Sequence, residues 1–343
     1  MPAAVTEKRG EIRIGVSGWR YAPWRGVFYP PKLGQKRELA YVASQLSSLE
    51  VNGSFYSLLR PETYQRWSDE TLDSFVFALK GSRYITHMLR LANARPALAN
   101  FFASGVLALG AKLGPVLWQL PERFVFDRDR IERFFEMLPR THAEAARLSR
   151  AHDARVDGRA LTRARHVGPI RHVIEPRHPS FETSAFTALC AAHDVAIVIA
   201  DTAGRFPTLV HPEVSSTVYV RLHGAEELYA SAYAISELRS WSRRIRRWAS
   251  DGRDVYVYFD NDVRAHAPFD AMALDALARG GRPTRSRPEL ASLDAEMPRT
   301  TWPAWTAARA VSPADVVRGS RRTPSARRAS PRGAADDPAT GTA

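Results

Sequence analysis

Cysteine is almost absent from this 343-residue chain, which contains only Cys190. A single cysteine excludes an internal disulfide and a thiolate metal cluster. Long apolar runs are absent as well, since no stretch reaches the roughly 18 residues that a membrane-spanning helix needs. The first nine residues carry charges but no apolar segment of the signal-peptide type. We therefore expect a cytoplasmic protein with no membrane partner, and we expect Cys190 to be buried.

Lysine is scarce among the basic residues. Only five of the 49 Lys and Arg residues are lysines, and 36 acidic residues leave a net charge of +13. An excess of positive charge favours anionic partners, with phosphate groups first among them. The arginine bias runs through the whole chain, however, and codon preference explains it as well as ligand binding does. The charge alone therefore identifies no ligand.

Eight short runs of apolar and β-branched residues recur along the chain, each followed by a longer segment with helical spacing. These runs are residues 12–17, 49–52, 75–80, 115–120, 172–175, 195–201, 217–223 and 255–260. Alternating strands and helices imply parallel pairing through right-handed crossovers, and eight such units close into a barrel. An open doubly wound sheet is the alternative, but no Gly-x-Gly-x-x-Gly turn follows the first run. We predict an α/β fold, a (β/α)8 TIM-like barrel.

The predicted barrel occupies one domain, residues 11–280, after a short extension at 1–10. Residues 151–168 are rich in arginine, interrupt the strand and helix pattern, and are expected to form an exposed insertion. Residues 281–343 contain eleven Arg, six acidic residues and much Pro, Ser and Ala, without periodicity. Such a composition cannot bury enough apolar surface to offset its ordering entropy, so we predict a mostly disordered basic tail. Trp302 and Trp305 within it either dock on the barrel or remain exposed.

One predicted helix lies between the seventh and eighth runs. Its apolar residues repeat at intervals of three and four: Ile235, Leu238, Trp241, Ile245 and Trp248. Its arginines fall elsewhere on the helical wheel: Arg239, Arg243, Arg246 and Arg247. We expect the apolar stripe to pack on the barrel. The arginine face is then either a solvated outer surface or a nucleic-acid contact.

The alternation of side chains within a strand predicts which residues enter the barrel. In residues 75–80 the phenylalanines suit the side that faces the helices, so Lys80 points inward. The same test directs polar or aromatic side chains inward at the ends of the other runs: Ser17, Trp19, Glu50, Asn52, Gln119, Glu175, Asp201, Arg221, His223, Tyr258 and Asp260. These positions lie at the carboxyl ends of the strands, where barrels of this kind carry their active sites. Because buried ions are costly when unpaired, they either satisfy one another or face a ligand.

Several ordered motifs resemble the YecE-like proteins, domain of unknown function 72. They are GVSGW (15–19), WRGVFYP (24–30), EVNGSFY (50–56), ITH (85–87), QLP (119–121), RHPS (177–180), YVRLHG (219–224) and YVYFDND (256–262). The resemblance runs from about residue 12 to about residue 280, and it implies a TIM-barrel-like fold without an established activity. The chain has Pro176 where the family usually has an aromatic residue, which leaves the direction of Arg177 open.

The mouth of the barrel combines cations with carboxylates, which predicts an enzyme of hydrolase or lyase type. Cations clamp phosphate or carboxylate groups, and a neighbouring carboxylate can act as general acid or base. The expected substrate is therefore anionic, for example phosphorylated or sugar-containing. The catalytic candidates are Glu50, Glu175, Lys80 and Asp201. The substrate-binding candidates are Ser17, Trp19, Asn52, Phe55, Tyr56, His87, Gln119, Arg177, Arg221, His223, Tyr258, Asp260 and Asn261.

Two alternatives use the same barrel differently. A metal-dependent nuclease would draw ligands from His87, His178, His223 and His266, although the chain has no HxH or HExxH pair among them. A nucleic-acid-binding protein without catalysis would use the positive charge and the exposed aromatic residues. The sequence itself implies no cofactor, and a divalent metal enters only through the first alternative.

Overall fold

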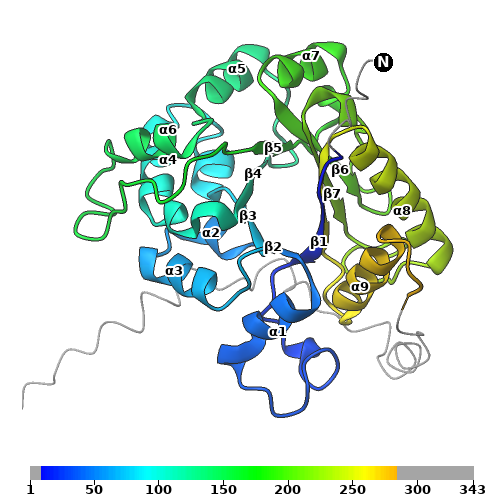
Figure 1. The fold of residues 1–343 in the computed structure, drawn as a ribbon. Coiled ribbons are helices and arrows are strands. Elements are labelled where there is room, and N and C mark those ends of the chain that lie inside the picture. The colour runs from blue at the N-terminus through cyan, green and yellow to red at the C-terminus, as the bar shows by residue number, and fades with distance from the viewer. Residues whose placement is uncertain (1–8, 284–343) are drawn as a thin grey trace, which may run out of the picture. The chain divides into compact units, whose positions relative to one another are not determined.

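The computed structural model describes residues 9–283, and they form a closed barrel of eight parallel strands in chain order (Figure 1). The strands are β1 (Ile12–Ser17), β2 (Ser48–Val51), β3 (Val76–Lys80), β4 (Leu113–Gln119), β5 (His172–Glu175), β6 (Val195–Asp201), β7 (Thr217–Leu222) and β8 (Asp254–Phe259). β1 pairs with β8, which closes the ring. The predicted (β/α)8 barrel is confirmed, and each strand lies within two residues of the predicted bounds.

Helices connect the strands and lie outside the ring (Figure 1). The α-helices are α1 (Glu38–Gln45), α2 (Gly53–Tyr56), α3 (Pro61–Asp69), α4 (Arg95–Ala103), α5 (Arg128–Met137), α6 (His142–Ser149), α7 (Ser184–Ala192), α8 (Ile235–Ser250) and α9 (His266–Ala278). Short 3₁₀ segments are η1 (Ala22–Trp24), η2 (Gln35–Arg37), η4 (Val106–Lys112), η5 (Pro179–Phe181) and η6 (Pro212–Val214), and η3 (Tyr84–Met88) is a π-helical turn. Asp127, Thr141 and Thr183 cap α5, α6 and α7 by accepting a backbone N–H.

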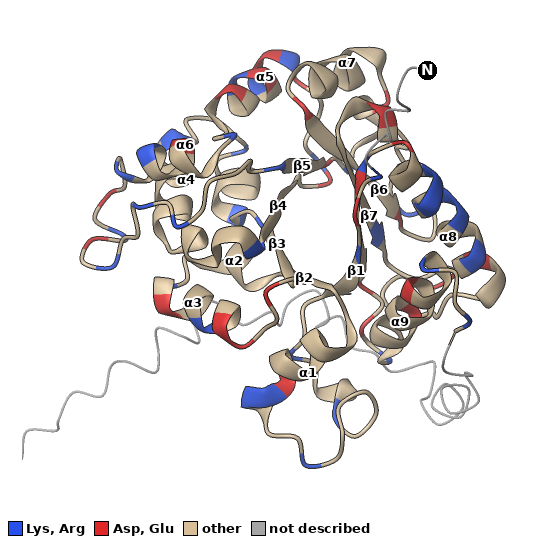
Figure 2. Ribbon diagram, in the orientation of Figure 1, with Lys and Arg blue, Asp and Glu red and all other residues tan. Residues whose placement is uncertain are grey.

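α8 shows how a polar helix is fixed to the barrel. Its apolar residues Leu238, Trp241, Ile245 and Trp248 are buried, as the spacing predicts. Its arginines form a row along the outer face, drawn in blue in Figure 2. Apolar burial supplies the main stabilisation of such a helix, while the charged side stays in solvent.

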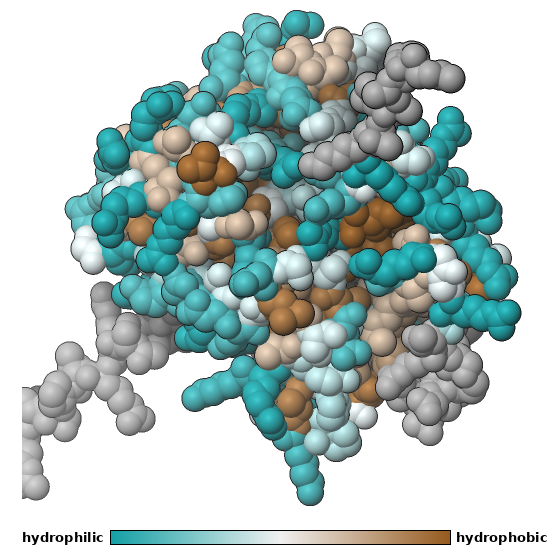
Figure 3. Space-filling view, in the orientation of Figure 1, coloured by the Kyte–Doolittle hydropathy of each residue, from teal (hydrophilic) through white to brown (hydrophobic). Residues whose placement is uncertain are grey.

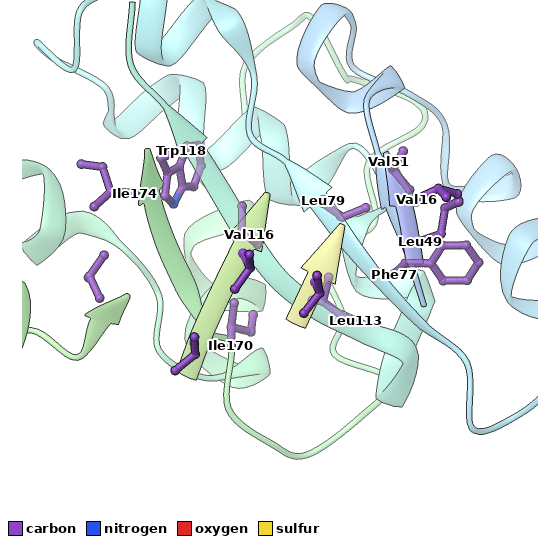
Figure 4. Close-up of a cluster of buried hydrophobic side chains, with 14 of the residues drawn as sticks. Val16, Leu49, Val51, Phe77, Leu79, Leu113, Val116, Trp118, Ile170 and Ile174 are labelled. Atoms are coloured by element: carbon purple, nitrogen blue, oxygen red, sulfur yellow. The ribbon is translucent and has the colours of Figure 1, made fainter. Parts of the chain in front are cut away.

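Two apolar cores flank the barrel wall. The larger core lies between strands and helices; Figure 4 shows part of it, with Val16, Leu49, Phe77, Val116 and Trp118 projecting from neighbouring strands. The smaller core fills the barrel interior with residues of the opposite alternation: Ala78, Leu117, Val173, Ala196, Val198, Ala200, Tyr219, Tyr256 and Tyr258. Small residues opposite three tyrosines let the interior pack densely. The interior is therefore filled below the mouth.

The surface and the connections complete the described fold. Residues 151–168 form no helix or strand and are mostly exposed, but Val156 is buried and Arg159 donates hydrogen bonds to the backbone oxygens of Leu58 and Leu59. Cys190 is buried, as expected. No helix within residues 9–283 is long and apolar enough to cross a membrane. On the face shown in Figure 3, hydrophobic side chains occur as separate patches among hydrophilic ones.

Residues 1–8 and 284–343 lie outside the described part of the chain. The predicted extension at 1–10 therefore falls largely outside it. So does most of the predicted tail, together with Trp302 and Trp305.

Candidate active site at the barrel mouth

Arg221 lies at the centre of the charged cluster in the mouth. It belongs to β7, in register with Ala200 and Tyr258, and its side chain is 1% exposed. Its guanidinium donates to Glu50 at 3.1 Å from Nε and 2.9 Å from Nη2. It also donates to Glu175 at 3.0 Å and to Asp260 at 2.8 Å. The three carboxylates belong to β2, β5 and the end of β8, so one arginine links strands from three sides of the barrel.

Glu50 is fully buried, and both of its oxygens are saturated. Oε1 accepts from Ser17 Oγ and from Nη2 of Arg221, while Oε2 accepts from Nε of Arg221 and from Tyr219 Oη at 2.7 Å. An ionised carboxylate offers about four acceptor sites, and here four donors occupy them. Ser17 and Glu50 are direct neighbours in the register of β1 and β2, which explains their contact. Glu50 therefore orients Arg221 and has no acceptor site left for a ligand.

Glu175 is held between two arginines and an amide. Oε2 accepts from Arg221 Nη1 and from Gln119 Nε2 at 2.9 Å, and Oε1 accepts from Arg177 Nε at 3.1 Å. Burial opposes its ionisation, but Arg221 and Arg177 outweigh burial and hold the pKa of Glu175 well below its ordinary value. The side chain of Arg177 thus turns back toward the mouth despite Pro176. At neutral pH Glu175 is an anchored anion that holds no proton to donate.

Asp260 and Asp262 follow β8 and differ in charge. Burial opposes ionisation of Asp260, but Arg221 and His223 lower its pKa to about 2. Nδ1 of His223 lies 3.1 Å from Oδ2 of Asp260. Burial and the charge of Asp260 raise the pKa of Asp262 to about 8. Two carboxyl groups in one loop therefore hold different protonation states at neutral pH, a pattern typical of acid and base pairs.

Lys80 ends β3 at the same mouth, and its surroundings differ from those of the arginines. Its Nζ lies 4.6 Å from the centre of the Phe55 ring. Burial and the charge of Arg221 lower the pKa of Lys80 to about 8, although Glu50 and Glu175 act in the opposite direction. Within residues 9–283 its ammonium forms no hydrogen bond and no ion pair. Lys80 is thus a buried cation that other side chains of the cluster do not satisfy.

His87 and the aromatic residues border Lys80. The Phe55 ring meets the ring of His87 edge to face at 5.2 Å and that of Tyr56 at 5.0 Å. Burial and the nearby cations Lys80 and Arg177 lower the pKa of His87 to about 4, so its imidazole is neutral at pH 7. His87 lies in the π-helical turn η3, a rare element that often marks functional sites. Tyr56 is half-buried, whereas Phe55 is buried beneath the Lys80 ammonium.

The structure brings most of the predicted site residues together. The cluster contains Ser17, Glu50, Asn52, Phe55, Tyr56, Lys80, His87, Gln119, Glu175, Arg177, Arg221, His223 and Asp260. Asn52 donates from Nδ2 to Ser17 Oγ at 3.1 Å, while its buried Oδ1 has no partner within the described residues.

Two predicted inward side chains point elsewhere. Asp201 was expected inward, but alternate residues of β6 (Ala196, Val198 and Ala200) fill the interior, and Asp201 Oδ2 accepts from Tyr233 Oη at 3.2 Å. Trp19 was expected to follow the alternation of β1, but the chain turns at Gly18, which has a φ of 84°. The Trp19 ring packs edge to face on Trp67 of α3 at 5.3 Å and belongs to the outer core.

Two further substrate-binding candidates lie away from the charged cluster. Tyr258 does point inward, but it lies in the filled interior and bonds Ser48 Oγ at 2.7 Å. The side chain of Asn261 points away from the mouth, opposite to that of Asp260. Its Nδ2 donates to Ser231 O and to Asp270 Oδ2, each at 2.9 Å. Asn261 therefore supports the loop after β8 against α9 rather than the mouth.

The sequence interpretation missed Tyr219 and Asp262. Tyr219 has the same inward alternation in β7 as Arg221, which could have indicated it, and its hydroxyl donates to Glu50 Oε2. Asp262 stands in the motif after β8, and its proximity to Asp260 could have indicated it. For the metal alternative, no group of three or more His, Cys, Asp or Glu in the described part of the chain could hold a metal ion.

Comparison with known proteins identifies relatives over most of the chain. Residues 13–292 match the family described as "Protein of unknown function DUF72". UPF0759 protein YunF of Bacillus subtilis (strain 168) is 22% identical over 281 residues, which cover 73% of this chain and 89% of that protein. UPF0759 protein YecE of Escherichia coli (strain K12) is 28% identical over 113 residues, which cover 33% of this chain and 39% of that protein.

Solved structures with the same architecture include two DUF72 family proteins. The one from Thermotoga maritima MSB8 superposes with a TM-score of 0.63 at 20% identity, covering 78% of this chain and 99% of that one. The one from Enterococcus faecalis V583 gives a TM-score of 0.60 at 16% identity, covering 78% of this chain and 95% of that one. At these identities the similarity shows the fold.

Proposed function

The chain belongs to the family of proteins of unknown function DUF72, and from that premise we propose that it is an enzyme of hydrolase or lyase type that acts on an anionic substrate at the barrel mouth. The observation that carries the proposal is the buried ammonium of Lys80, which forms an ion pair with no carboxylate of the described residues. A desolvated cation of this kind is costly for folding unless a ligand uses it. Phosphorylated or sugar-containing compounds are the substrates that this charge favours.

The groups of the mouth divide into anchors and ligand contacts. The carboxylate oxygens of Glu50 and Glu175 accept hydrogen bonds from Arg221, Arg177 and neighbouring donors. We therefore assign these two residues the role of holding the arginines in position. Lys80 is the group that reaches the reacting atoms, because its lowered pKa provides a neutral amine at accessible pH. Arg177, 14% exposed, binds the anionic group of the substrate.

An activity screen tests this function. Native protein is incubated with pooled phosphorylated sugars, sugar acids and keto acids, and consumption is followed by mass spectrometry. We expect at least one class to be consumed, and we expect Lys80→Met to abolish the reaction. The control Lys36→Met, at an exposed position, should retain it. Consumption that persists in Lys80→Met would contradict the assignment.

A second candidate function, nucleic-acid binding, has one specific observation in its favour. A surface hollow of about 400 Å³ is lined by Arg9, Arg246, Arg247 and Ser250, with no acidic residue among the lining residues that the structure describes. Clustered arginines contact phosphates through a salt-dependent electrostatic attraction. Fluorescence anisotropy with a labelled single-stranded oligonucleotide tests it.

The double variant Arg246→Glu, Arg247→Glu should weaken oligonucleotide binding by about tenfold or more at low salt. The control Arg66→Glu, exposed on α3, should have little effect. Equal losses in both proteins would reduce the binding to nonspecific attraction by net charge.

A further inference from the structure

The backbone at Lys80 is fixed on both sides of the residue. Ser54 Oγ of α2 donates to the Lys80 carbonyl oxygen at 2.7 Å, and the Gly81 N–H donates to Leu117 O at 2.8 Å. A side chain at Gly81 would come within 2.3 Å of the Trp118 ring, so only glycine fits there. A reactive group gains from such support, because its position is set before a ligand arrives.

The chain contains a second buried lysine, which shows what a structural lysine looks like. Lys112 is 7% exposed, and its Nζ donates to Ser68 O at 2.6 Å and to Thr71 O at 2.9 Å. Lys80 is 9% exposed, and its Nζ donates no hydrogen bond within residues 9–283. The two lysines are thus similarly buried, but only the ammonium of Lys112 has hydrogen-bond partners among the described residues. The structural explanation that accounts for Lys112 does not account for Lys80.

The neighbours of Lys80 suit a nucleophilic amine better than a permanent ammonium. Arg221 and Arg177 lie close enough to disfavour its charge, and the Phe55 ring removes solvent from one side. Glu50 and Glu175 favour the charge but are bound to the arginines. A lysine beside other cations and an apolar surface is typical of amines that attack carbonyl carbon.

Arg177 provides the second contact that such a substrate needs. Its guanidinium lies 4.6 Å from the centre of the Phe206 ring and, among residues 9–283, pairs with one carboxylate, that of Glu175. The remaining N–H groups of its planar fork can donate to two oxygens of a carboxylate or a phosphate. The Phe55 ring contacts both the Lys80 ammonium, at 4.6 Å, and the His87 ring, at 5.2 Å, and the charges of Lys80 and Arg177 both lower the pKa of His87.

We propose that Lys80 forms an imine with the carbonyl carbon of a substrate whose carboxylate or phosphate group is bound by Arg177. This inference rests on the proposed function and names the substrate class, an anionic aldehyde or ketone. The neutral amine adds to the carbonyl carbon, and a carbinolamine results. One amine proton passes to the carbonyl oxygen as the carbinolamine forms; the one remaining N–H proton then passes to the hydroxyl group, which leaves as water while the C=N bond forms. His87, neutral at pH 7 and bonded to Thr86 at Nδ1, is the group that carries these protons.

Borohydride trapping tests the inference on the native full-length protein. The probes are pyruvate, glyceraldehyde 3-phosphate and the uncharged propanal, each followed by borohydride and peptide mass spectrometry. The five lysines of the chain make the map simple. We expect reduced adducts at Lys80 to form at least about tenfold faster than at the exposed Lys32 and Lys36, because more of its amine is neutral near pH 7. Lys112 should remain unmodified.

Two controls separate the anion contact from the imine. In Arg177→Met, trapping by pyruvate and glyceraldehyde 3-phosphate should fall by about tenfold or more, whereas trapping by propanal should persist. If only one of the two anionic probes is preferred over propanal, that preference identifies carboxylate or phosphate as the anionic group. Excess inorganic phosphate should slow trapping by the preferred anionic probe.

The outcomes distinguish this inference from the proposed function. Preferential adducts at Lys80 that depend on Arg177 support both. Labelling of Lys80 no faster than that of Lys32 overturns the imine, and the proposed function survives if inorganic phosphate still raises the melting temperature of the native protein but not of Arg177→Met. If phosphate has no such effect and Lys80 is not labelled preferentially, both fall.

Discussion

The hydrogen bonds of Glu50 give a quantitative prediction for Glu50→Gln. The amide keeps the shape of the side chain, but its NH₂ end replaces one carboxylate oxygen. Two of the four donors, one of them on Arg221, would then face another donor. A hydrogen bond to a charged group contributes about 1.5–3 kcal/mol, and breaking a buried ion pair costs about 3–5 kcal/mol. We therefore expect the free energy of unfolding to fall by about 3–5 kcal/mol.

Urea unfolding followed by tryptophan fluorescence measures this loss as a lower midpoint with an unchanged slope. The matched control is Glu11→Gln, because Glu11 also pairs with an arginine, Arg13 at 2.6 Å, but is 66% exposed. Exposed pairs contribute about 0–1 kcal/mol, so the control should differ little from the wild type. A loss below about 1 kcal/mol in Glu50→Gln would refute the view that Glu50 anchors a buried Arg221.

Three pH-dependent predictions follow from the other titrating groups. Lys80→Met should stabilise the protein by on the order of 1–3 kcal/mol near pH 7, because the folded pKa of Lys80, about 8, lies below its unfolded value. The wild type regains this stability as the pH rises toward about 10. Urea unfolding midpoints of both proteins at about pH 7 and about pH 10 check the prediction. The folded pKa of Asp262, about 8, lies above its unfolded value, so the wild type loses stability as the pH rises from about 4 to about 8. Asp262→Asn should therefore raise the melting temperature most near pH 8. An equal rise near pH 4 and near pH 8 would contradict this. Burial lowers the pKa of His172 to about 3, so the wild type loses stability as the pH falls below about 6.5, where the histidine of the unfolded chain becomes protonated. His172→Gln should therefore reduce the loss of unfolding free energy at acid pH, measured by urea unfolding. An unchanged pH dependence would count against this.

The barrel could be predicted because its strands are short, apolar and regularly followed by helices. The alternation of β3 was readable because two phenylalanines fix its outer face, so Lys80 was placed correctly. In β6 no residue type distinguishes the inward face from the outward one, because the residues before Asp201 are apolar on both faces, as is usual in a parallel barrel. The inward prediction for Asp201 therefore had no support in the pattern, and it failed.

Other errors at the site arose where the strands had already ended. Trp19 follows a left-handed glycine, after which strand alternation no longer applies. Asn261 lies one residue beyond Asp260, and its contacts with the loop and α9 depend on the packing of a distant segment. The saturation of Glu50 by Tyr219 and Arg221 is likewise a long-range result. Residue type predicts that charges meet at the mouth, while only coordinates show which of them are already paired.

If Lys80 is an amine without a partner beside an anion site, its own titration will show it. Labelling the five lysines with ¹³C at Cε yields few NMR signals, and the one lost in Lys80→Arg identifies Lys80. We expect a pKa of about 8 that rises when inorganic phosphate is added, because a bound anion favours the ammonium. A pKa near the ordinary value of about 10.4 that phosphate leaves unchanged would contradict it.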